Sequence, residues 1–347
     1  MSIKHGWWVA MLPLLAVPAL ASEFNGAGSS AAAPLYLGWS GGYWRESKEM
    51  LNYDPVGSSR GMEAIRGQRV DFGATDVPPS AEEMARRGWV LVPTAVTGVV
   101  PVVNLPRLVA GRMQLNGELL ARIYLGKISH WNDPAIAALN PGLNLPPLPI
   151  QVLARAEGAG TTYNFSAYLS VVSAAWRQER GSGFTVVGPV AKKIEGGAKA
   201  LVKALQATEG AITVVDFNLV REERLNDVRL PSRDGRYLRA GAVAFSEAVM
   251  NSRWMSAGEF SEPLIARPGG GSWPITTGTF VVLPRVADKP ERVTRVANFL
   301  LWGFRHGDQQ VRAQSFVKLP DLVQAKASSA LSSIQTRNGQ NLALQFF

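Results

Sequence analysis

The stretch RGWVLVPTAVTGVVPVVNLP, residues 87–106, constrains the fold more than any other part of the chain. It is rich in β-branched residues and interrupted by prolines, so it predicts buried strands joined by a crossing segment. Helical and strand patterns alternate around it, which is typical of α/β layers built on mainly parallel sheets. We expect helices over residues 31–49 and 116–128 and a further helix that starts in 61–67. We expect strands over 51–54 and 70–73. The stretch RPGGGSWP (267–274) is expected to be a linker or boundary loop.

The first 21 residues predict a secretory leader. Lys4 gives a basic start, residues 7–17 form an apolar run, and Ala19-Leu20-Ala21 fits the small-x-small pattern of a cleavage site. A membrane anchor is the alternative, but the run is shorter than the roughly 20 residues that a spanning helix needs, and prolines interrupt it. The chain has no cysteine, which excludes a disulfide framework and the cysteine-anchored lipid of a lipoprotein. We therefore expect a soluble periplasmic protein that begins near Ser22.

The formal net charge is +9, and it becomes +8 when the leader and its Lys4 are removed. Basic residues are scattered, as in Arg86-Arg87 and Lys192-Lys193, with acidic residues between them. Nucleic-acid-binding proteins gather such charge on one face with aromatic residues, so we expect a solvated basic surface and no nucleic-acid partner. A positive field favours the capture of anions.

Three stretches combine glycines and hydroxyl residues and then lead into a helical pattern: GAGSSAAAPLY (26–36), VGSSRGMEAI (56–65) and RAEGAGTTYNF (155–165). Glycines let backbone N–H groups point inward, hydroxyls add donors, and free N–H groups at a helix start carry partial positive charge. Each stretch alone is also an ordinary helix cap. Together, with Arg155 offering a planar fork, they predict an anion site. The alternative for Arg155 is a salt bridge with Glu157.

Asp76 lies between the second and third of these stretches, in VDFGATDVPPS (70–80). It follows an expected strand end and precedes two prolines, so it is held in a turn. Asp76 could simply cap that turn. A carboxylate among anion donors otherwise makes sense only if the anion brings a proton to it.

These motifs, together with VTGVVPVVNLP (96–106), IYLGKISHWNDPAIAALNPGL (123–143), EGAI (209–212) and WPITTGTF (273–280), resemble the successive signatures of the PstS family. Members of this family are the periplasmic phosphate-binding proteins of Pst ABC transporters. The resemblance runs from about Gly26 to Phe304. It implies a two-lobed type II periplasmic-binding-protein fold, in which two mainly parallel sheets flanked by helices are joined by two crossing strands. Lobe 1 would comprise residues 22–95 and 276–347, and lobe 2 residues 96–275.

The resemblance also implies a function and a set of site residues. The protein would capture phosphate in the cleft between the closing lobes and deliver it to an ABC permease, as a monomer without cofactor or metal. The implied contacts to the anion are Ser30 and the backbone of Ala31, Ser58, Asp76 as the acceptor of the ligand's proton, and Arg155, Gly160 and Thr161 from the other lobe. Residues of uncertain or supporting role are Ser29, Ser59, Arg60, Glu157, Ala159 and Thr162.

The chain departs from the family pattern at several of these positions. It has Ser30, Ala31 and Ala32 where relatives have threonine, phenylalanine and proline, and Arg60 where they have glycine. The family's Asp-Gly-Ser-Gly becomes residues 157–160, Glu-Gly-Ala-Gly, which removes one hydroxyl donor, and VAKKIEGG (190–197) replaces a glycine-rich run. A binding or sensing protein for another oxyanion, with weakened affinity for phosphate, is therefore the alternative function.

Enzymatic functions have less support in the sequence. Residues 57–61 match the G-x-S-x-G motif of hydrolases, but this chemistry needs a histidine that reaches the serine. The mature chain has only His130 and His306. With no cysteine and no H-E-x-x-H spacing, no set of metal ligands can be proposed either. We expect a binding protein, not an enzyme.

Overall fold

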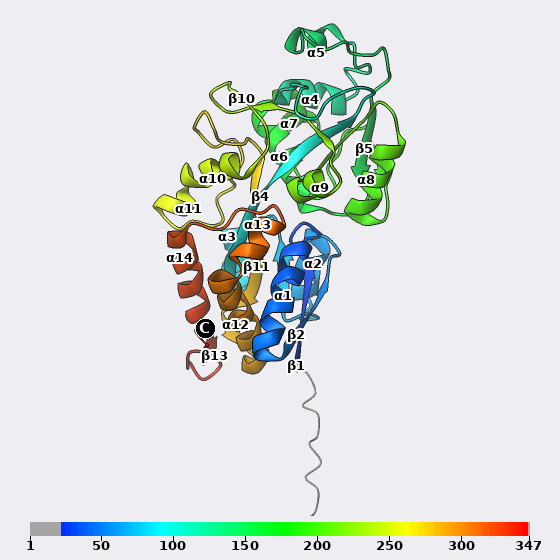
Figure 1. Cartoon of the computed structure of the whole chain (residues 1–347). Coiled ribbons are helices and arrows are strands. Elements are labelled where there is room, and N and C mark those ends of the chain that lie inside the picture. The colour runs from blue at the N-terminus through cyan, green and yellow to red at the C-terminus, as the bar shows by residue number, and fades with distance from the viewer. Residues whose placement is uncertain (1–21, 346–347) are drawn as a thin grey trace, which may run out of the picture.

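The computed structural model describes residues 22–345. The expected leader, residues 1–21, lies outside the described residues. Two lobes lie one above the other in Figure 1, and a shared sheet path with the strand order β2-β1-β3-β11-β4-β7-β5-β6 connects them. The predicted α/β class with mainly parallel sheets is thereby confirmed.

The lower lobe in Figure 1 is built on three parallel strands near the N-terminus. β1 (Ser22–Gly28) pairs with β2 (Glu49–Asp54) on one side and with β3 (Phe72–Thr75) on the other. β11 (Thr276–Pro284) returns from the other lobe and pairs antiparallel with β3. The flanking helices include α1 (Ala33–Ser47), α2 (Ser58–Arg66) and α12 (Pro290–His306).

The predicted elements of this lobe form, with shifted ends. The helix expected over 31–49 is α1, the strand expected over 51–54 is part of β2, and the strand expected over 70–73 is β3, which begins and ends two residues later. The helix expected to start in 61–67 begins three residues earlier, at Ser58. Gly57 has φ 94°, a left-handed conformation that favours glycine, and this sharp turn allows the earlier start.

The stretch that predicted several strands is a single long strand, so the expectation of separate strands joined by a crossing segment is wrong. β4 (Trp89–Asn104) runs without a break from the lower lobe to the upper lobe, as Figure 1 shows. Its first half pairs with β11 and its second half with β7 (Ala211–Asp216). The pairing with β11 shifts register beside Pro93, which accommodates one of the prolines within the strand.

The upper lobe continues the sheet beyond β4. β7 pairs antiparallel with β4 and parallel with β5 (Gln151–Arg155), and β5 pairs parallel with β6 (Lys192–Ile194). The helices of this lobe include α4 (Gly117–Tyr124), α6 (Gly160–Val172), α8 (Gly197–Ala207) and α9 (Phe217–Glu222). α4 lies within the helix predicted over 116–128, and residues 267–274 form an irregular loop before β11, as predicted.

Shorter elements complete the two lobes. They are the helices α3 (Ala81–Arg87), α5 (Pro134–Leu139), α7 (Ala174–Glu179), α10 (Ala242–Met250), α11 (Arg253–Ser256), α13 (Asp308–Ala313) and α14 (Asp321–Ser332), and the two-residue strands β8 (Asn226–Asp227), β9 (Leu230–Pro231), β10 (Tyr237–Leu238), β12 (Val286–Ala287) and β13 (Gln335–Thr336).

Packed aromatic side chains fix α1 against β1 and α12. Phe24 of β1 lies 5.4 Å from Phe299 of α12 between ring centroids, and Tyr43 of α1 lies 5.6 Å from the same ring. Trp39 of α1 contacts Phe299 as well, and all four side chains are buried. Burying each such ring contributes about 1.5–3 kcal/mol. This packing holds the middle and second half of α1 against β1 and α12.

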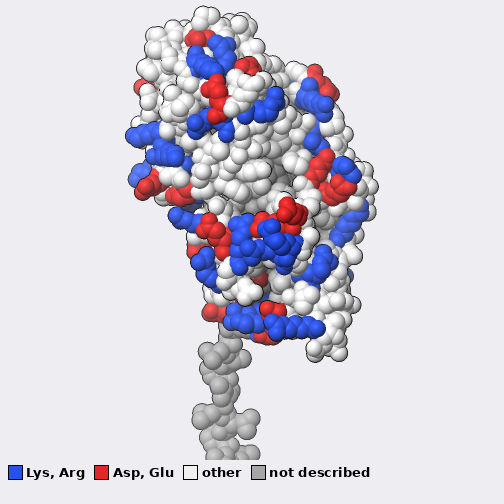
Figure 2. All heavy atoms as spheres, turned by 180° about the vertical axis from the view of Figure 1, so that it is seen from behind, with Lys and Arg blue, Asp and Glu red and all other residues white. Residues whose placement is uncertain are grey.

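Charged residues of both signs are mixed on the surface. Figure 2 shows lysine and arginine side chains close to acidic ones over both lobes of the face it presents. Ion pairs of the described residues include Arg66 with Glu83 and Arg292 with Asp71. Among residues 22–345, none of the helices is both long and apolar enough to cross a bilayer.

Candidate anion-binding site

Four polar side chains meet where the parallel strands of both lobes end. Ser29 follows β1, Asp76 follows β3, Arg155 ends β5 and Asp216 ends β7. Open α/β sheets bind ligands at the carboxyl ends of their strands, because the loops there can approach one another without disturbing the core. All four side chains are at least 94% buried. These strand ends are the candidate site.

The carboxylate of Asp76 accepts hydrogen bonds from two of the predicted hydroxyl residues. Ser29 Oγ lies 2.6 and 2.7 Å from its two oxygens, and Ser58 Oγ lies 3.2 Å from Oδ2. Ser58 is the first residue of α2, and its Oγ also accepts a bond from the backbone N–H of Asp76. The structure thus brings together the first two glycine and hydroxyl stretches around Asp76.

Asp76 does not cap its own turn, so that alternative interpretation is wrong. The hydroxyl of Thr75 bonds both to the carbonyl and to the N–H of Val77, and it closes the turn instead. The backbone carbonyl of Asp76 accepts bonds from Asn164 of α6 and Thr277 of β11, each at 3.0 Å. α6 and β11 therefore hold the backbone of Asp76 in place, and its carboxylate remains available to the site.

Arg155 reaches from the upper lobe to the first loop of the lower lobe. Its NH1 donates to Ser30 Oγ at 2.9 Å, although the two residues are 125 positions apart. Its Nε lies 3.6 Å from Glu157 Oε2, so the ion pair with Glu157, which was the alternative for Arg155, also exists. Nε has no hydrogen-bond partner among the described residues. The guanidinium therefore has donor capacity left that an anion could take up.

Glu157 is itself anchored by the segment that departs from the family pattern. Its Oε1 accepts the backbone N–H groups of Gly196 and Gly197 at 2.8 and 3.0 Å. Lys192 and Lys193 of the same segment are exposed on β6. The segment thus supports the residue beside Arg155 through its backbone.

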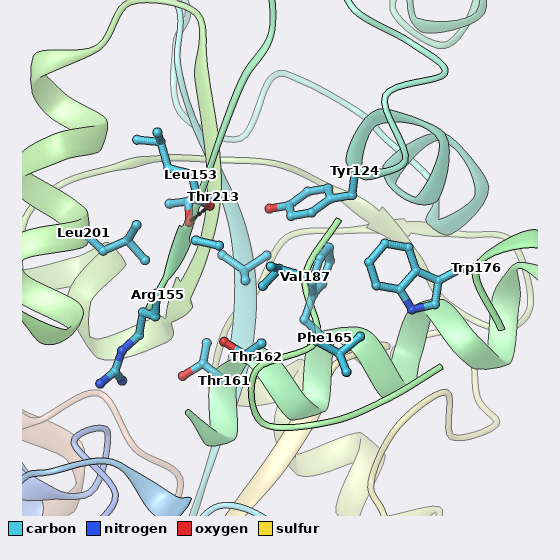
Figure 3. A pocket seen from close by; sticks show the side chains of 13 residues that line it. Tyr124, Leu153, Arg155, Thr161, Thr162, Phe165, Trp176, Val187, Leu201 and Thr213 are labelled. Atoms are coloured by element: carbon cyan, nitrogen blue, oxygen red, sulfur yellow. Dashed lines mark hydrogen bonds between the residues drawn. The ribbon is translucent and has the colours of Figure 1, made fainter. Parts of the chain in front are cut away.

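The stem of Arg155 packs against a small apolar cavity inside the upper lobe. The cavity, of about 10 Å³, is lined among others by Tyr124, Phe165, Trp176 and Leu201. Figure 3 shows the guanidinium pointing away from this cavity. The apolar packing on one side and Ser30 on the other restrict Arg155 to one orientation, and little rotamer entropy is left to lose on binding an anion.

The start of α6 presents backbone N–H groups at the same place. Ala159 is the N-cap residue and has no side chain that could cap the helix, while Gly160, Thr161 and Thr162 form the buried first turn. A Cβ on Gly160 would lie only 2.7 Å from Asp76 Oδ2 and from Ser58 Oγ. Only glycine allows the helix start to approach the Asp76 carboxylate this closely.

Asp216 was not predicted from the sequence, although it stands in the same relation to its strand as Asp76. It ends the buried strand β7, and its two carboxylate oxygens each lie 3.0 Å from Thr161 Oγ1. The pattern of a buried strand followed by an aspartate in AITVVD could have indicated it. Asn164 and Thr277 were missed as well, because their role is to hold the Asp76 backbone across the two lobes, which requires the tertiary fold.

Burial and mutual repulsion set the charge state of the two aspartates. Desolvation, with a further contribution from the nearby Asp216 charge, raises the pKa of Asp76 to about 7, although hydrogen bonds from Ser29 and Ser58 oppose the rise. Desolvation likewise raises the pKa of Asp216 to about 6, against the effects of Thr161 and Arg155. The site therefore favours a proton shared with one of its carboxylates.

Two of the predicted residues, Ser59 and Arg60, lie at the edge of the site or outside it. Ser29 is closer to Asp76 than Ser58 is, whereas Ser59 is only partly buried beside Gly158. Arg60 is exposed and lines a separate groove of about 750 Å³ on the lower lobe with Tyr53 and Arg69. It does not line the site.

Neither of the two described histidines, His130 and His306, forms a hydrogen bond to Ser58 or Ser59 of the G-x-S-x-G motif. His130 Nδ1 lies 3.0 Å from Ser129 Oγ in an exposed segment, and His306 lies against Trp302 at the end of α12. Ser58 Oγ donates to Asp76. Within the described part of the chain there is also no group of three or more possible metal ligands.

Comparisons with known proteins give the relatives of this chain. Residues 16–302 match the family model of the PBP superfamily domain. The phosphate-binding protein PstS of Pasteurella multocida is 35% identical over 325 residues, covering 93% of this chain and 94% of the relative, and that of Haemophilus influenzae is 34% identical over 320 residues, covering 91% and 94%.

Solved structures agree with the fold. A human phosphate-binding apolipoprotein superposes with a TM-score of 0.69 at 19% identity, covering 93% of this chain and 99% of that one. A phosphate-binding protein from Stenotrophomonas maltophilia gives a TM-score of 0.66 at 18% identity, covering 89% and 93%. At these identities the likeness concerns the fold alone. From the family model and the two relatives it follows that the chain belongs to the PBP superfamily and, within it, to the family of the PstS proteins.

Proposed function

We propose that this protein captures inorganic phosphate, as hydrogen phosphate, between its two lobes and delivers it to an ABC permease. The observation that carries the proposal is Asp76, a buried carboxylate at the strand ends that accepts hydrogen bonds from Ser29 and Ser58 and lies beside Gly160 at the start of α6 in the opposite lobe. The names of the relatives, phosphate-binding protein PstS, support the same ligand.

The donors would come from both lobes. We assign to the ligand the hydroxyls of Ser30 and Ser58 and the backbone of Ala31 from the lower lobe, and Arg155, Gly160 and Thr161 from the upper lobe. The bond between Arg155 and Ser30 would open on binding, because both groups would turn to phosphate oxygens. We keep the lobe boundaries 22–95 with 276–347, and 96–275, as part of this proposal.

Selectivity would come from the single acceptor among many donors. Hydrogen phosphate brings a proton at neutral pH and can donate it to Asp76, whereas sulfate has none and leaves two negative groups facing each other. The raised pKa of Asp76 is consistent with a carboxylate whose negative charge is costly until a proton donor arrives.

The place of action and the partners follow from the same reading. We propose export through the N-terminal leader, a periplasmic location, monomeric capture of phosphate and release to a permease of the Pst type. The binding step needs no cofactor, because hydrogen bonds and charge alone would hold the ligand. The family's members are named as binding proteins, and we propose that this protein has no catalytic activity.

One observation favours another oxyanion as the alternative ligand. Ala159 is fully buried at the N-cap of α6, so no hydroxyl is available at that point of the site. An oxyanion with fewer acceptor oxygens, such as an organophosphonate, would lose less there than phosphate.

Calorimetric titration of the purified protein with phosphate, arsenate, sulfate and methylphosphonate tests the proposal. Phosphate and arsenate should bind, and sulfate should bind about tenfold more weakly or worse, since an unmet buried acceptor costs about 1–3 kcal/mol. Tighter binding of sulfate than of phosphate would refute the proposal, and preference for methylphosphonate would support the alternative. An ester-hydrolysis assay on the same sample should give no activity above buffer.

A further inference from the structure

Asp216 is a second buried carboxylate of the cleft, and its partner is a residue assigned to the ligand. It ends β7, is 3% exposed and does not cap the helix α9 that follows it. Both of its oxygens lie 3.0 Å from Thr161 Oγ1, on the first turn of α6. Nothing in the structural role of β7 or α9 requires a carboxylate at this point.

Two charged groups act on Asp216 from the elements around it. The positive charge of Arg155 in β5 stabilises the ionised form of Asp216, and the negative charge of Asp76, which follows β3, destabilises it. From β4, Val99 pairs with its backbone, and the lysines of α8, Lys199 and Lys203, are exposed. With both aspartates ionised, the two carboxylates outnumber the guanidinium before any anion enters.

The hydroxyl of Thr161 has one hydrogen, so the state of Asp216 decides what Thr161 offers to the ligand. If Asp216 is ionised, Thr161 donates to it and can only accept a bond from the ligand. If Asp216 is protonated, its O–H donates to Thr161, whose own hydrogen is then free for a phosphate oxygen. Either arrangement places one proton, in addition to the hydroxyl's own hydrogen, on the line from the ligand through Thr161 to Asp216.

We propose that Asp216 is a positioning residue that acts through Thr161 and makes the cleft hold phosphate with one proton more than hydrogen phosphate carries. This inference rests on the proposed function. The first proton lies between the ligand and Asp76, and the second lies on the Thr161–Asp216 line. The cleft therefore holds the equivalent of dihydrogen phosphate, whichever atom carries the second proton.

This assignment has a consequence for the dependence of binding on pH. Above neutral pH the free ligand is mainly hydrogen phosphate and both aspartates are ionised, so binding must take up one proton from solution. Proton uptake of one per binding event makes the dissociation constant rise about tenfold for each pH unit. A cleft with Asp76 as its only acceptor would take up none.

Calorimetry at pH 8.5 in two buffers of different ionisation enthalpy measures the number of protons taken up when inorganic phosphate binds. We expect about one proton for the wild type and about none for Asp216→Asn, because the amide donates permanently to Thr161. Between pH 7.5 and 8.5 the dissociation constant should rise about five- to tenfold in the wild type, because Asp76 and the free ligand are still partly protonated at pH 7.5, and it should stay within about twofold in the variant. Glu118→Gln, which removes an exposed carboxylate of the same lobe, should behave as the wild type.

Equal proton uptake by the wild type and Asp216→Asn would overturn the inference. If Asp216→Asn does not fold, Thr161→Val serves instead, because it interrupts the hydrogen-bonded line from the ligand to Asp216 while leaving Asp216 in place. Thr161→Val should bind phosphate more weakly and take up no proton. Uptake of one proton by this variant would equally overturn the inference. Absence of any phosphate binding by the wild type would instead refute the proposed function.

Discussion

The substitution Arg155→Lys tests whether the buried guanidinium is the charged anchor of the anion. Arg155 is 6% exposed, its NH1 donates to Ser30 at 2.9 Å and its Nε has no hydrogen-bond partner among the described residues. Lysine keeps the positive charge but replaces the planar fork with a single ammonium group. The variant can therefore bond one phosphate oxygen where arginine can bond two.

The loss is that of one charge-assisted hydrogen bond in a buried site. Such a bond contributes about 1.5–3 kcal/mol, so the dissociation constant for phosphate should rise by a factor of roughly 10 to 150. Because Glu157 remains beside the new ammonium and its anchors Gly196 and Gly197 do not change, we expect the fold around the site to persist.

The assay is isothermal calorimetry with phosphate at pH 7.5. Arg239→Lys is the matched control, because Arg239 also forms a two-pronged contact in the upper lobe, with Asp227 at 2.7 Å for both bonds, but away from the strand ends. The control should bind phosphate within about twofold of the wild type. Wild-type affinity in Arg155→Lys would make Arg155 a structural residue and refute the reasoning.

Four further outcomes are expected. Ala159→Ser should bind phosphate about tenfold more tightly, because its hydroxyl can donate a hydrogen bond to the ligand, and it should raise the free energy of unfolding by about 0.5–2 kcal/mol, because the hydroxyl can cap α6. Calorimetry and thermal melts that show neither gain would contradict this. Gly160→Ala should prevent the close approach to Asp76 and weaken phosphate binding about tenfold or more, as a Cβ would lie 2.7 Å from the carboxylate; unchanged affinity would mean that the lobes bind without this contact. Because the pKa values of Asp76 and Asp216 are raised in the folded, ligand-free protein, the two groups contribute stability that is fully present below the pKa of a free carboxyl, about 4, and is lost as pH rises to about 7. The melting temperature should therefore fall from pH 5 to pH 8, and it should fall less in Asp216→Asn. A melting temperature that rises with pH in both proteins would contradict this direction. Tyr124→Phe should keep or raise the melting temperature, because the buried hydroxyl of Tyr124 has no hydrogen-bond partner within residues 22–345. A loss of stability would contradict this and would indicate a bound water in the cavity.

Local patterns were sufficient for the helices that begin at the site. The glycine and hydroxyl stretches predicted that a helix follows each of them, as α1, α2 and α6 do, because glycine turns are encoded within a few residues. The strands β1, β5 and β7, whose ends carry Ser29, Arg155 and Asp216, were not predicted. The prolines in β4 led to the prediction of several strands. A proline is tolerated within a strand only where the neighbouring strand adapts, and here the register of β11 shifts beside Pro93. Such an adaptation cannot be read from the segment itself.

The site could be predicted only as far as single loops determine it. Asp76 and Arg155 were found because each lies in or beside a recognisable stretch. Asp216 was missed because its importance comes from Thr161, 55 residues earlier in the chain, and from a sheet order that places β7 beside β5. Ser29 lies closer to Asp76 than Ser58 does, and this likewise depends on how β1 and β3 pair.

The ratio of the phosphate to the sulfate dissociation constant, measured by calorimetry in the wild type and in Asp76→Asn, tests the central claim most directly. The claim is that Asp76 accepts the proton of hydrogen phosphate. The wild type should prefer phosphate, and the variant should lose that preference, because an asparagine amide can donate to an unprotonated oxygen of sulfate. An unchanged phosphate-to-sulfate ratio in Asp76→Asn would remove Asp76 from the site and contradict the account.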